Sequence, residues 1–210
     1  MIKPDNVKPK DFAVVIGLIA WMLACYMIPN KFPLREPYSI PPTVIDQMTP
    51  YSVEWIWIYV SYYIYIFGIY LVVSNQETRS RMVYSYLSSS AFSSLIFFAF
   101  PTTIPRESPP QLNTNQLSDW AFSFIKSADA NLNCLPSMHI AVSVLASLVV
   151  RRESKFWGNV GLVWTLLISY STMATKQHYF LDVVTGAAYG LLFWNLTDQY
   201  FKRRIENKIS

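Results

Sequence analysis

The amino-acid sequence predicts an all-α integral membrane protein, built as a six-transmembrane helical bundle with one extracytoplasmic amphipathic helix. Three observations lead to this fold class: the composition, the number of apolar runs and the distribution of basic residues. Hydrophobic residues make up 52% of the 210-residue chain and charged residues only 14%. A soluble domain carries roughly 25% charged residues, so this chain would expose more apolar surface than water tolerates. We therefore expect a single polytopic membrane domain over residues 1–210.

Six apolar runs, bounded by charge or proline, give the predicted spans at residues 12–28, 55–73, 83–100, 138–150, 157–173 and 182–200. Runs one, two, three and five are each about 17 to 19 residues long, close to the minimum that crosses the hydrocarbon core. The fourth run is shorter and lies between Pro136 and the pair Arg151-Arg152. We expect its N-terminal end to begin within the protein at membrane depth. The sixth run begins at Asp182 and ends near Tyr200.

The basic residues predict the orientation of these spans. An even number of spans places both termini on one side, and twelve of the 17 Lys and Arg residues then fall on that side. Cytoplasmic loops carry the excess of positive charge, so we expect cytoplasmic termini, a location in the plasma (inner) membrane, and extracytoplasmic loops at 29–54 and 101–137. The five outer basic residues are Lys31, Arg35, Arg106, Lys126 and Lys176.

Partners other than lipid are not indicated. The net charge is +4, but no basic stripe with interleaved aromatic residues predicts nucleic-acid binding. The two cysteines, Cys25 and Cys134, match neither a disulfide framework nor a zinc site, so we expect free thiols.

Two segments on the outer side have an amphipathic or aromatic character. Residues 117–130 are predicted to form a surface helix that packs over the outer ends of the bundle, with one apolar face made of Leu117, Trp120, Ala121, Phe124 and Ile125. Aromatic residues near the outer end of the second span are typical of anchors at the membrane interface, and they are Trp55, Trp57, Tyr59 and Tyr62 to Tyr65.

The chain has two histidines, and both lie at the outer mouths of predicted spans. His139 is at the start of the fourth span and His178 is just before the sixth. Arg106, Lys176 and Asp182 fall on the same aqueous side. Ionisable groups at membrane depth are costly and usually functional, so this cluster is the candidate site.

The residue types around each histidine suit anion chemistry. Ser137 is in the N-cap position before His139, where the free amides and the positive dipole end of a helix bind anions; both an ordinary cap and a direct ligand remain open for this serine. If residues 176–182 are helical, His178 and Asp182 at spacing four lie on one face and can touch. A carboxylate bound to one imidazole nitrogen fixes the tautomer and leaves the other nitrogen nucleophilic.

Pro136-Ser137-Met138-His139 and the later Ser171-Thr172-x5-His178-x3-Asp182 resemble the second and third motifs of the type 2 phosphatidic acid phosphatase superfamily, PSGH and SRx5Hx3D. Within this superfamily, Ser137-Met138-His139 and the aromatic run from His178 to Asp182 resemble the inositol phosphorylceramide and sphingomyelin synthase branch more than the lipid phosphatase branch.

All three motifs depart from the family pattern. In the first motif, Kx6RP, Arg106 is the candidate arginine, but Glu107 follows where proline is expected and Ala99 occupies the lysine position. Met138 replaces the usual glycine, and Thr172 replaces the arginine of the third motif. Lys176 supplies a positive charge near His178, though without the bidentate geometry of a guanidinium.

The resemblance implies a metal-independent phosphoryl transfer without a cofactor. His178 would attack phosphorus to form a phosphohistidine, Asp182 would orient it, and His139 would serve as acid and then base. Phosphate binding would fall to Arg106, Ser137 and Lys176. The expected substrate is a phospholipid or polyprenyl phosphate, as monoester or pyrophosphate, hydrolysed at the extracytoplasmic face.

Two alternatives remain open. With a lipid or polyol hydroxyl as acceptor, the same histidines would serve a head-group phosphotransferase. In a non-enzymatic membrane transporter or scaffold, the histidines would be incidental. A transporter is expected to carry ionisable groups near the middle of several helices, whereas runs one, two, three and five contain no charged residue.

Overall fold

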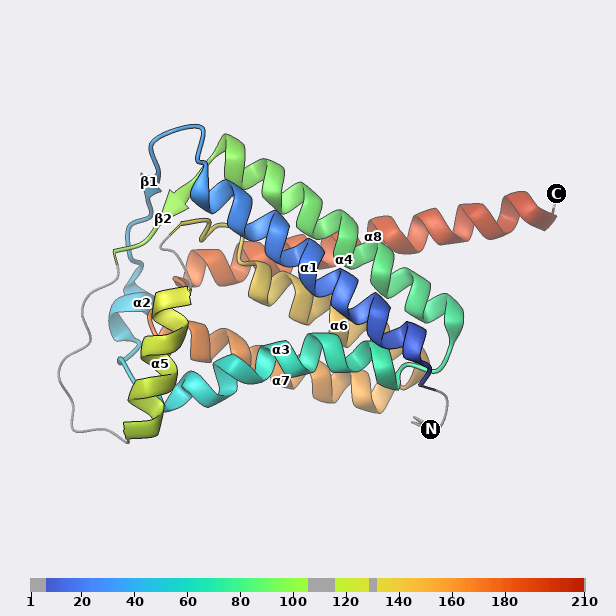
Figure 1. The fold of residues 1–210 in the computed structure, drawn as a ribbon, viewed down its shortest axis with the longest axis horizontal. Coiled ribbons are helices and arrows are strands. Elements are labelled where there is room, and N and C mark those ends of the chain that lie inside the picture. Colours follow the sequence, from blue (N-terminus) through green and yellow to red (C-terminus); the bar gives the residue numbers. More distant parts are fainter. Residues whose placement is uncertain (1–6, 106–115, 129–131, 210) are drawn as a thin grey trace.

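The computed structural model describes residues 7–105, 116–128 and 132–209. Within them, six long helices form a bundle (Figure 1): α1 (Pro9–Lys31), α3 (Ile56–Val72), α4 (Gln76–Ala99), α6 (Met138–Glu153), α7 (Lys155–Ala174) and α8 (Phe180–Ile209). The connections contain β1 (Tyr38–Ser39), α2 (Val44–Met48), the 3-10 turn η2 (Val53–Trp55), β2 (Thr102–Thr103) and α5 (Gln116–Ala128). Each predicted apolar run coincides with one long helix, which confirms the all-α architecture.

In the part of the chain that the structure describes, three helical segments are long and apolar enough to cross a membrane, and they are Pro9–Lys31, Val53–Val72 and Gln76–Ala99. They correspond to the first three predicted spans. Helices also occupy the other three ranges, and their membrane crossing stays a prediction. Helices α4 and α8 extend well past their apolar runs. Helix α4 begins at Gln76, where the Asn75 side chain accepts from the Thr78 amide, and α8 continues to Ile209 and projects beyond the bundle (Figure 1).

Helix α6 is the central helix of the bundle. It packs against α3, α4, α7 and α8, and Leu145, Ala146 and Val149 have no exposed surface. The start of the helix is also buried: the N-cap Ser137 is fully buried and Met138 is 8% exposed. The fourth run thus begins within the protein, because neighbouring helices surround this helix. Its depth in the membrane stays a prediction.

Two glycines allow α8 to lie directly against α6. A Cβ atom at Gly186 would stand 2.6 Å from the carbonyl oxygen of Ser137, and one at Gly190 would stand 2.6 Å from that of Ala141. Contact this close excludes any side chain. Because Asp182 is one turn before Gly186, the same approach brings Asp182 to the start of α6, where its carbonyl oxygen accepts from the Ser137 amide at 3.2 Å.

The two long connecting loops meet at one end of the bundle. Strands β1 and β2 pair in parallel, with Tyr38 opposite Thr102. Helix α5 occupies most of the predicted range 117–130, and its extracytoplasmic position stays a prediction. Its packing differs in part from the predicted apolar face. Ala121, Phe122 and Ile125 are buried against η2 and α3, whereas the predicted members Leu117, Trp120 and Phe124 are exposed. The contacting stripe is rotated because α5 lies along the start of α3.

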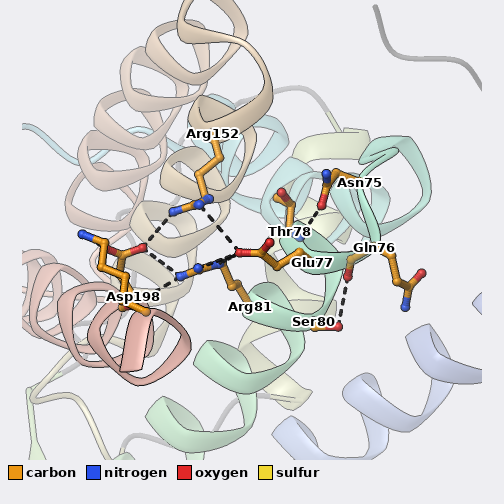
Figure 2. A network of polar contacts seen from close by, with 9 residues as sticks. Asn75, Gln76, Glu77, Thr78, Ser80, Arg81, Arg152 and Asp198 are labelled. Carbon is orange, nitrogen blue, oxygen red and sulfur yellow. Dashed lines mark hydrogen bonds and ion pairs between the residues drawn. The ribbon is translucent and has the colours of Figure 1, made fainter. Parts of the chain in front are cut away.

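The opposite end of the bundle is held by ion pairs (Figure 2). Arg81 of α4 has only 2% of its side chain exposed and donates to Glu77 at 2.7 Å and to Asp198 of α8 at 2.8 Å. Arg152 of α6 also donates to Asp198, at 2.8 Å. One carboxylate therefore joins three helices.

Both cysteines, Cys25 and Cys134, are free thiols and buried.

Candidate active site

The structure brings together three residues that the sequence singled out. His139 lies in the first turn of α6, His178 in the turn between α7 and α8, and Asp182 in the first turn of α8. The Nδ1 atom of His139 is 3.1 Å from Nε2 of His178, and Nδ1 of His178 is 3.3 Å from Oδ2 of Asp182. The expected helix over His178 is absent because α8 begins at Phe180. The contact across four residues is made over a helix start instead.

The hydrogen-bond partners define the state of His178. Asp182 is fully buried, and its Oδ2 also accepts from the Tyr179 amide at 2.9 Å. A carboxylate can only accept, so Nδ1 of His178 carries the hydrogen of their contact. The Nε2 atom then presents a lone pair toward His139. This arrangement suits a nucleophilic imidazole, because the carboxylate stabilises positive charge that develops on the ring.

A tight turn presents His178 to the site. The amides of Gln177 and His178 both donate to the carbonyl of Thr172, at 2.8 and 3.1 Å, and Lys176 takes a φ of 53°. Thr172 is fully buried, so the position where the family pattern has arginine serves here to close the turn. A left-handed φ is uncommon for a lysine, so contacts from elsewhere must hold it.

Helix α2 supplies those contacts. The Lys176 ammonium donates to the carbonyls of Asp46 and Thr49, at 3.1 and 2.6 Å. The Asp46 carboxylate accepts from the Phe180 amide at 2.7 Å. Lys176, expected to bind phosphate, is thus directed toward the backbone of α2. Sequence reasoning did not consider Asp46, although Thr43 and Asp46 have the spacing of a capping box, which both side chains form here.

The remaining predicted phosphate ligands differ in what the structure shows. Ser137 is at the N-cap of α6 but makes no capping hydrogen bond, and its buried Oγ has no hydrogen-bond partner among the described residues. An ordinary cap, one of the two readings of this serine, is therefore not formed. Arg106 lies outside the described residues.

An apolar cavity of about 370 Å³ leads to the two histidines. Its walls come mainly from α1 and α3, and His139 and His178 form part of the lining. The apolar and aromatic lining residues include Met22, Leu23, Tyr26, Met27, Tyr62, Tyr63, Ile66, Phe67 and Met138. Leu23 and Met27 are about half exposed on the outside of α1. The cavity therefore connects the histidines with the lateral surface of the bundle.

Tyrosines of α3 surround His139. The Tyr59 hydroxyl is 3.1 Å from Nε2 of His139, and the ring centroid of Tyr62 is 4.8 Å from that of the imidazole. Tyr59 is fully buried and Tyr62 is 4% exposed, so the expectation that they are interfacial anchors is wrong. The aromatic composition of the segment could not distinguish a lipid-facing tyrosine from one that faces α6.

The chemistry of this arrangement is specific. An imidazole nitrogen backed by a carboxylate lies beside a second imidazole, an arrangement that suits nucleophilic attack together with protonation of a leaving group. Among the described residues, no group of three or more His, Cys, Asp or Glu side chains is placed to hold a metal ion.

Comparison with known proteins gives one family match. A family model described as the PAP2 superfamily matches residues 42–196. Neither the curated proteins nor the solved structures give a match. The matched range covers about three quarters of the sequence. It includes α2, both histidines, Asp182 and the turn that presents His178. By this match the chain belongs to the PAP2 superfamily.

Proposed function

We propose that this protein is an integral-membrane lipid phosphatase that hydrolyses a phospholipid or polyprenyl phosphate, as monoester or pyrophosphate, at the extracytoplasmic face. Membership of the superfamily supports phosphatase or phosphotransferase chemistry. The observation that carries the proposal is the chain of contacts from His139 through His178 to Asp182 at an apolar cavity. A cavity that reaches the side of the bundle suits a substrate whose hydrocarbon chain stays in lipid.

The proposed reaction has two steps. In the first, Nε2 of His178 attacks phosphorus, the bond from phosphorus to the leaving oxygen breaks, and protonated His139 gives a proton to that oxygen. In the second, water attacks the phosphohistidine, His139 accepts a proton from the water, and inorganic phosphate leaves as His178 is restored. Asp182 accepts from Nδ1 of His178 throughout. General acid–base catalysis of this kind contributes roughly 10²–10⁴-fold in rate.

Phosphate binding is proposed for Ser137, the first amides of α6 and Arg106. The unpartnered Ser137 Oγ supports its part, because a buried hydroxyl without a partner has a hydrogen bond to give. The first amides of a helix have no helical acceptors and favour anions. For Lys176, the contacts with α2 support a role other than the predicted phosphate binding, in which its side chain holds the turn that carries His178.

The test is phosphate release by purified protein in detergent from phosphatidate, phosphatidylglycerophosphate and a polyprenyl pyrophosphate. We expect release from at least one substrate by wild-type protein, undiminished by a strong chelator, and none by His178→Ala. If wild-type protein releases no phosphate but transfers a labelled head group between lipids, the function is that of a head-group phosphotransferase, which the wording of the motifs favours. If His178→Ala leaves all lipid turnover unchanged, the histidines are incidental and the scaffold or transporter class holds.

A further inference from the structure

Tyr59 makes a contact that the proposed mechanism does not use. Its hydroxyl lies against Nε2 of His139, while Nδ1 of the same ring faces His178, each at 3.1 Å. We infer that Tyr59 is a positioning residue that holds the His139 ring, so that Nδ1 delivers the proton to the leaving oxygen while Nε2 gains or loses its own proton beside the phenol. The kinetic part of this inference rests on the proposed function.

The hydrogens along the chain of contacts fix the neutral state of His139. Because Nδ1 of His178 donates to Asp182, the Nε2 atom of neutral His178 carries a lone pair and no hydrogen. If Nδ1 of His139 were also bare, two lone pairs would face each other at 3.1 Å. Neutral His139 must therefore carry its hydrogen on Nδ1, and Tyr59 must donate to Nε2. In this arrangement each of the three contacts contains one hydrogen.

A tyrosine hydroxyl suits this position because it can donate or accept. When His139 takes up a proton for its role as acid, the new hydrogen is on Nε2, and the Tyr59 oxygen accepts it. After Nδ1 has given its proton to the leaving group, the Nε2 hydrogen remains bound to Tyr59. The ring therefore keeps one orientation through each protonation state, and no proton needs to leave the phenol.

The surroundings of the ring restrict it in the same way. The ring centroids of Tyr59, Tyr62 and Tyr63 lie 5.2, 4.8 and 6.4 Å from that of His139. All three residues belong to α3, so one rigid element sets the position of the imidazole. A second tyrosine of α3 binds α6 in the same manner, because the Tyr65 hydroxyl is 2.7 Å from Oγ of Ser147. Tyr65→Phe is therefore a matched control for Tyr59→Phe.

The kinetic test compares the two variants with 1,2-dioleoyl phosphatidate and with p-nitrophenyl phosphate. For phosphatidate, we expect Tyr59→Phe to lower kcat about 10- to 100-fold with KM within about twofold of wild type, and Tyr65→Phe to leave both values unchanged. With p-nitrophenyl phosphate, the loss in the burst of nitrophenol release during the first turnover should shrink to less than about threefold. A nitrophenolate leaves without a proton, and this burst precedes the step in which His139 accepts a proton from water. In a His139→Ala background, Tyr59→Phe should cause no further loss. Equal losses in Tyr59→Phe and Tyr65→Phe, or an additional loss in the His139→Ala background, would overturn the inference.

A second measurement does not depend on turnover. The chain has two histidines, so ¹⁵N spectra of protein labelled at the imidazole nitrogens contain two ring systems, which His178→Ala assigns. At a pH where His139 is neutral, wild type and Tyr65→Phe should show its hydrogen on Nδ1, and Tyr59→Phe should show a mixture of tautomers. An unchanged spectrum in Tyr59→Phe would contradict the positioning role. Absence of phosphate release by wild type would instead contradict the proposed function.

Discussion

At the scale of single residues, the directions of the hydrogen bonds in the site follow from the Asp182 carboxylate, which can only accept. Asp182 is fully buried and accepts from both His178 and the Tyr179 amide. Its charge determines which nitrogen of His178 is bare, and through that nitrogen the state of His139. The carboxylate is therefore the reference point for every hydrogen in the chain of contacts.

Asp182→Asn should lower kcat by about 10³-fold with little change in KM. The amide has no negative charge to stabilise a cationic His178, and its NH₂ group can face Nδ1 and favour the wrong tautomer. Phosphate release under saturating phosphatidate measures the effect. Asp11→Asn is the control, because Asp11 is a buried carboxylate paired with Arg79 at 3.3 Å, near the start of α1. A similar loss of kcat per folded molecule in both variants would contradict the role of Asp182.

The sequence contained part of this site. The spacing of His178 and Asp182 predicted their contact through a helix, and the contact forms although His178 lies before the start of α8. Tyr59 could not be found in this way, since it is 80 residues from His139 in the chain and only the packing of α3 on α6 joins them. The contacts of Lys176 with α2 likewise depend on how a distant loop folds back.

At the scale of elements, the site exists where α6 and α8 begin side by side. Gly186 permits this approach, and α2 holds the turn before α8 through Asp46. Both features lie outside the catalytic residues, but they determine the distance between His139 and His178. A misplacement of about 1 Å can lower a rate about 100-fold, so small changes in these elements should be visible in kcat.

Gly186→Ala should lower kcat at least tenfold, because its Cβ atom would stand 2.6 Å from the Ser137 carbonyl and α8 must move. Gly68→Ala in α3 is the matched control, since a Cβ atom there meets nothing within 4 Å. We expect the control to keep its activity and to gain about 0.5–1 kcal/mol of stability from helix propensity. Steady-state kinetics and thermal unfolding in detergent test both variants. Full activity in Gly186→Ala would show that the contact between α6 and α8 does not set the site.

Asp46→Ala should lower kcat about tenfold and the free energy of unfolding by about 1–2 kcal/mol. It removes the acceptor of the Phe180 amide and one half of the capping box of α2. Asp46→Asn keeps a carbonyl oxygen for one of these bonds and should lie between wild type and the alanine variant. Kinetics together with a melting curve provide the measurement. A loss of stability at unchanged kcat would limit α2 to a structural role.

At the scale of the whole molecule, the bundle separates its site from its strongest ion pairs. Arg152 is 13 residues beyond His139 in α6, so the two are about 20 Å apart along the helix. The ion pairs around Arg81 join α4, α6 and α8 at that distant end (Figure 2). Stability and catalysis should therefore respond to different substitutions.

Arg81→Met should lower the free energy of unfolding by about 2 kcal/mol and leave kcat within about twofold of wild type. Losing one member of a buried ion pair costs about 3–5 kcal/mol when the other charge is left alone, but Asp198 keeps Arg152 and Lys202. Chemical denaturation in detergent gives the first value and phosphate release the second. Arg203→Met, at an exposed position of the same end, is the control and should change neither value.

Most of the architecture could be predicted from the sequence, because apolar runs of spanning length indicate helices regardless of their packing. The six helix positions followed from these runs, whereas the stripe of α5 that packs on η2 and α3 did not. Periodicity shows that a helix has an apolar side, but the neighbours decide which residues are buried. Similarly, the basic residues predicted an orientation, while the burial of Arg81 depends on partners in other helices.

The covalent intermediate on His178 is the most direct test of the account. Wild-type protein is mixed with ³²P-labelled phosphatidate and quenched in alkali within one turnover, since phosphohistidine survives base and is lost in acid. We predict base-stable, acid-labile label on His178, present in wild type, absent in His178→Ala, and retained in His139→Ala when p-nitrophenyl [³²P]phosphate replaces the lipid. Turnover of the lipid without label on His178 would contradict the account.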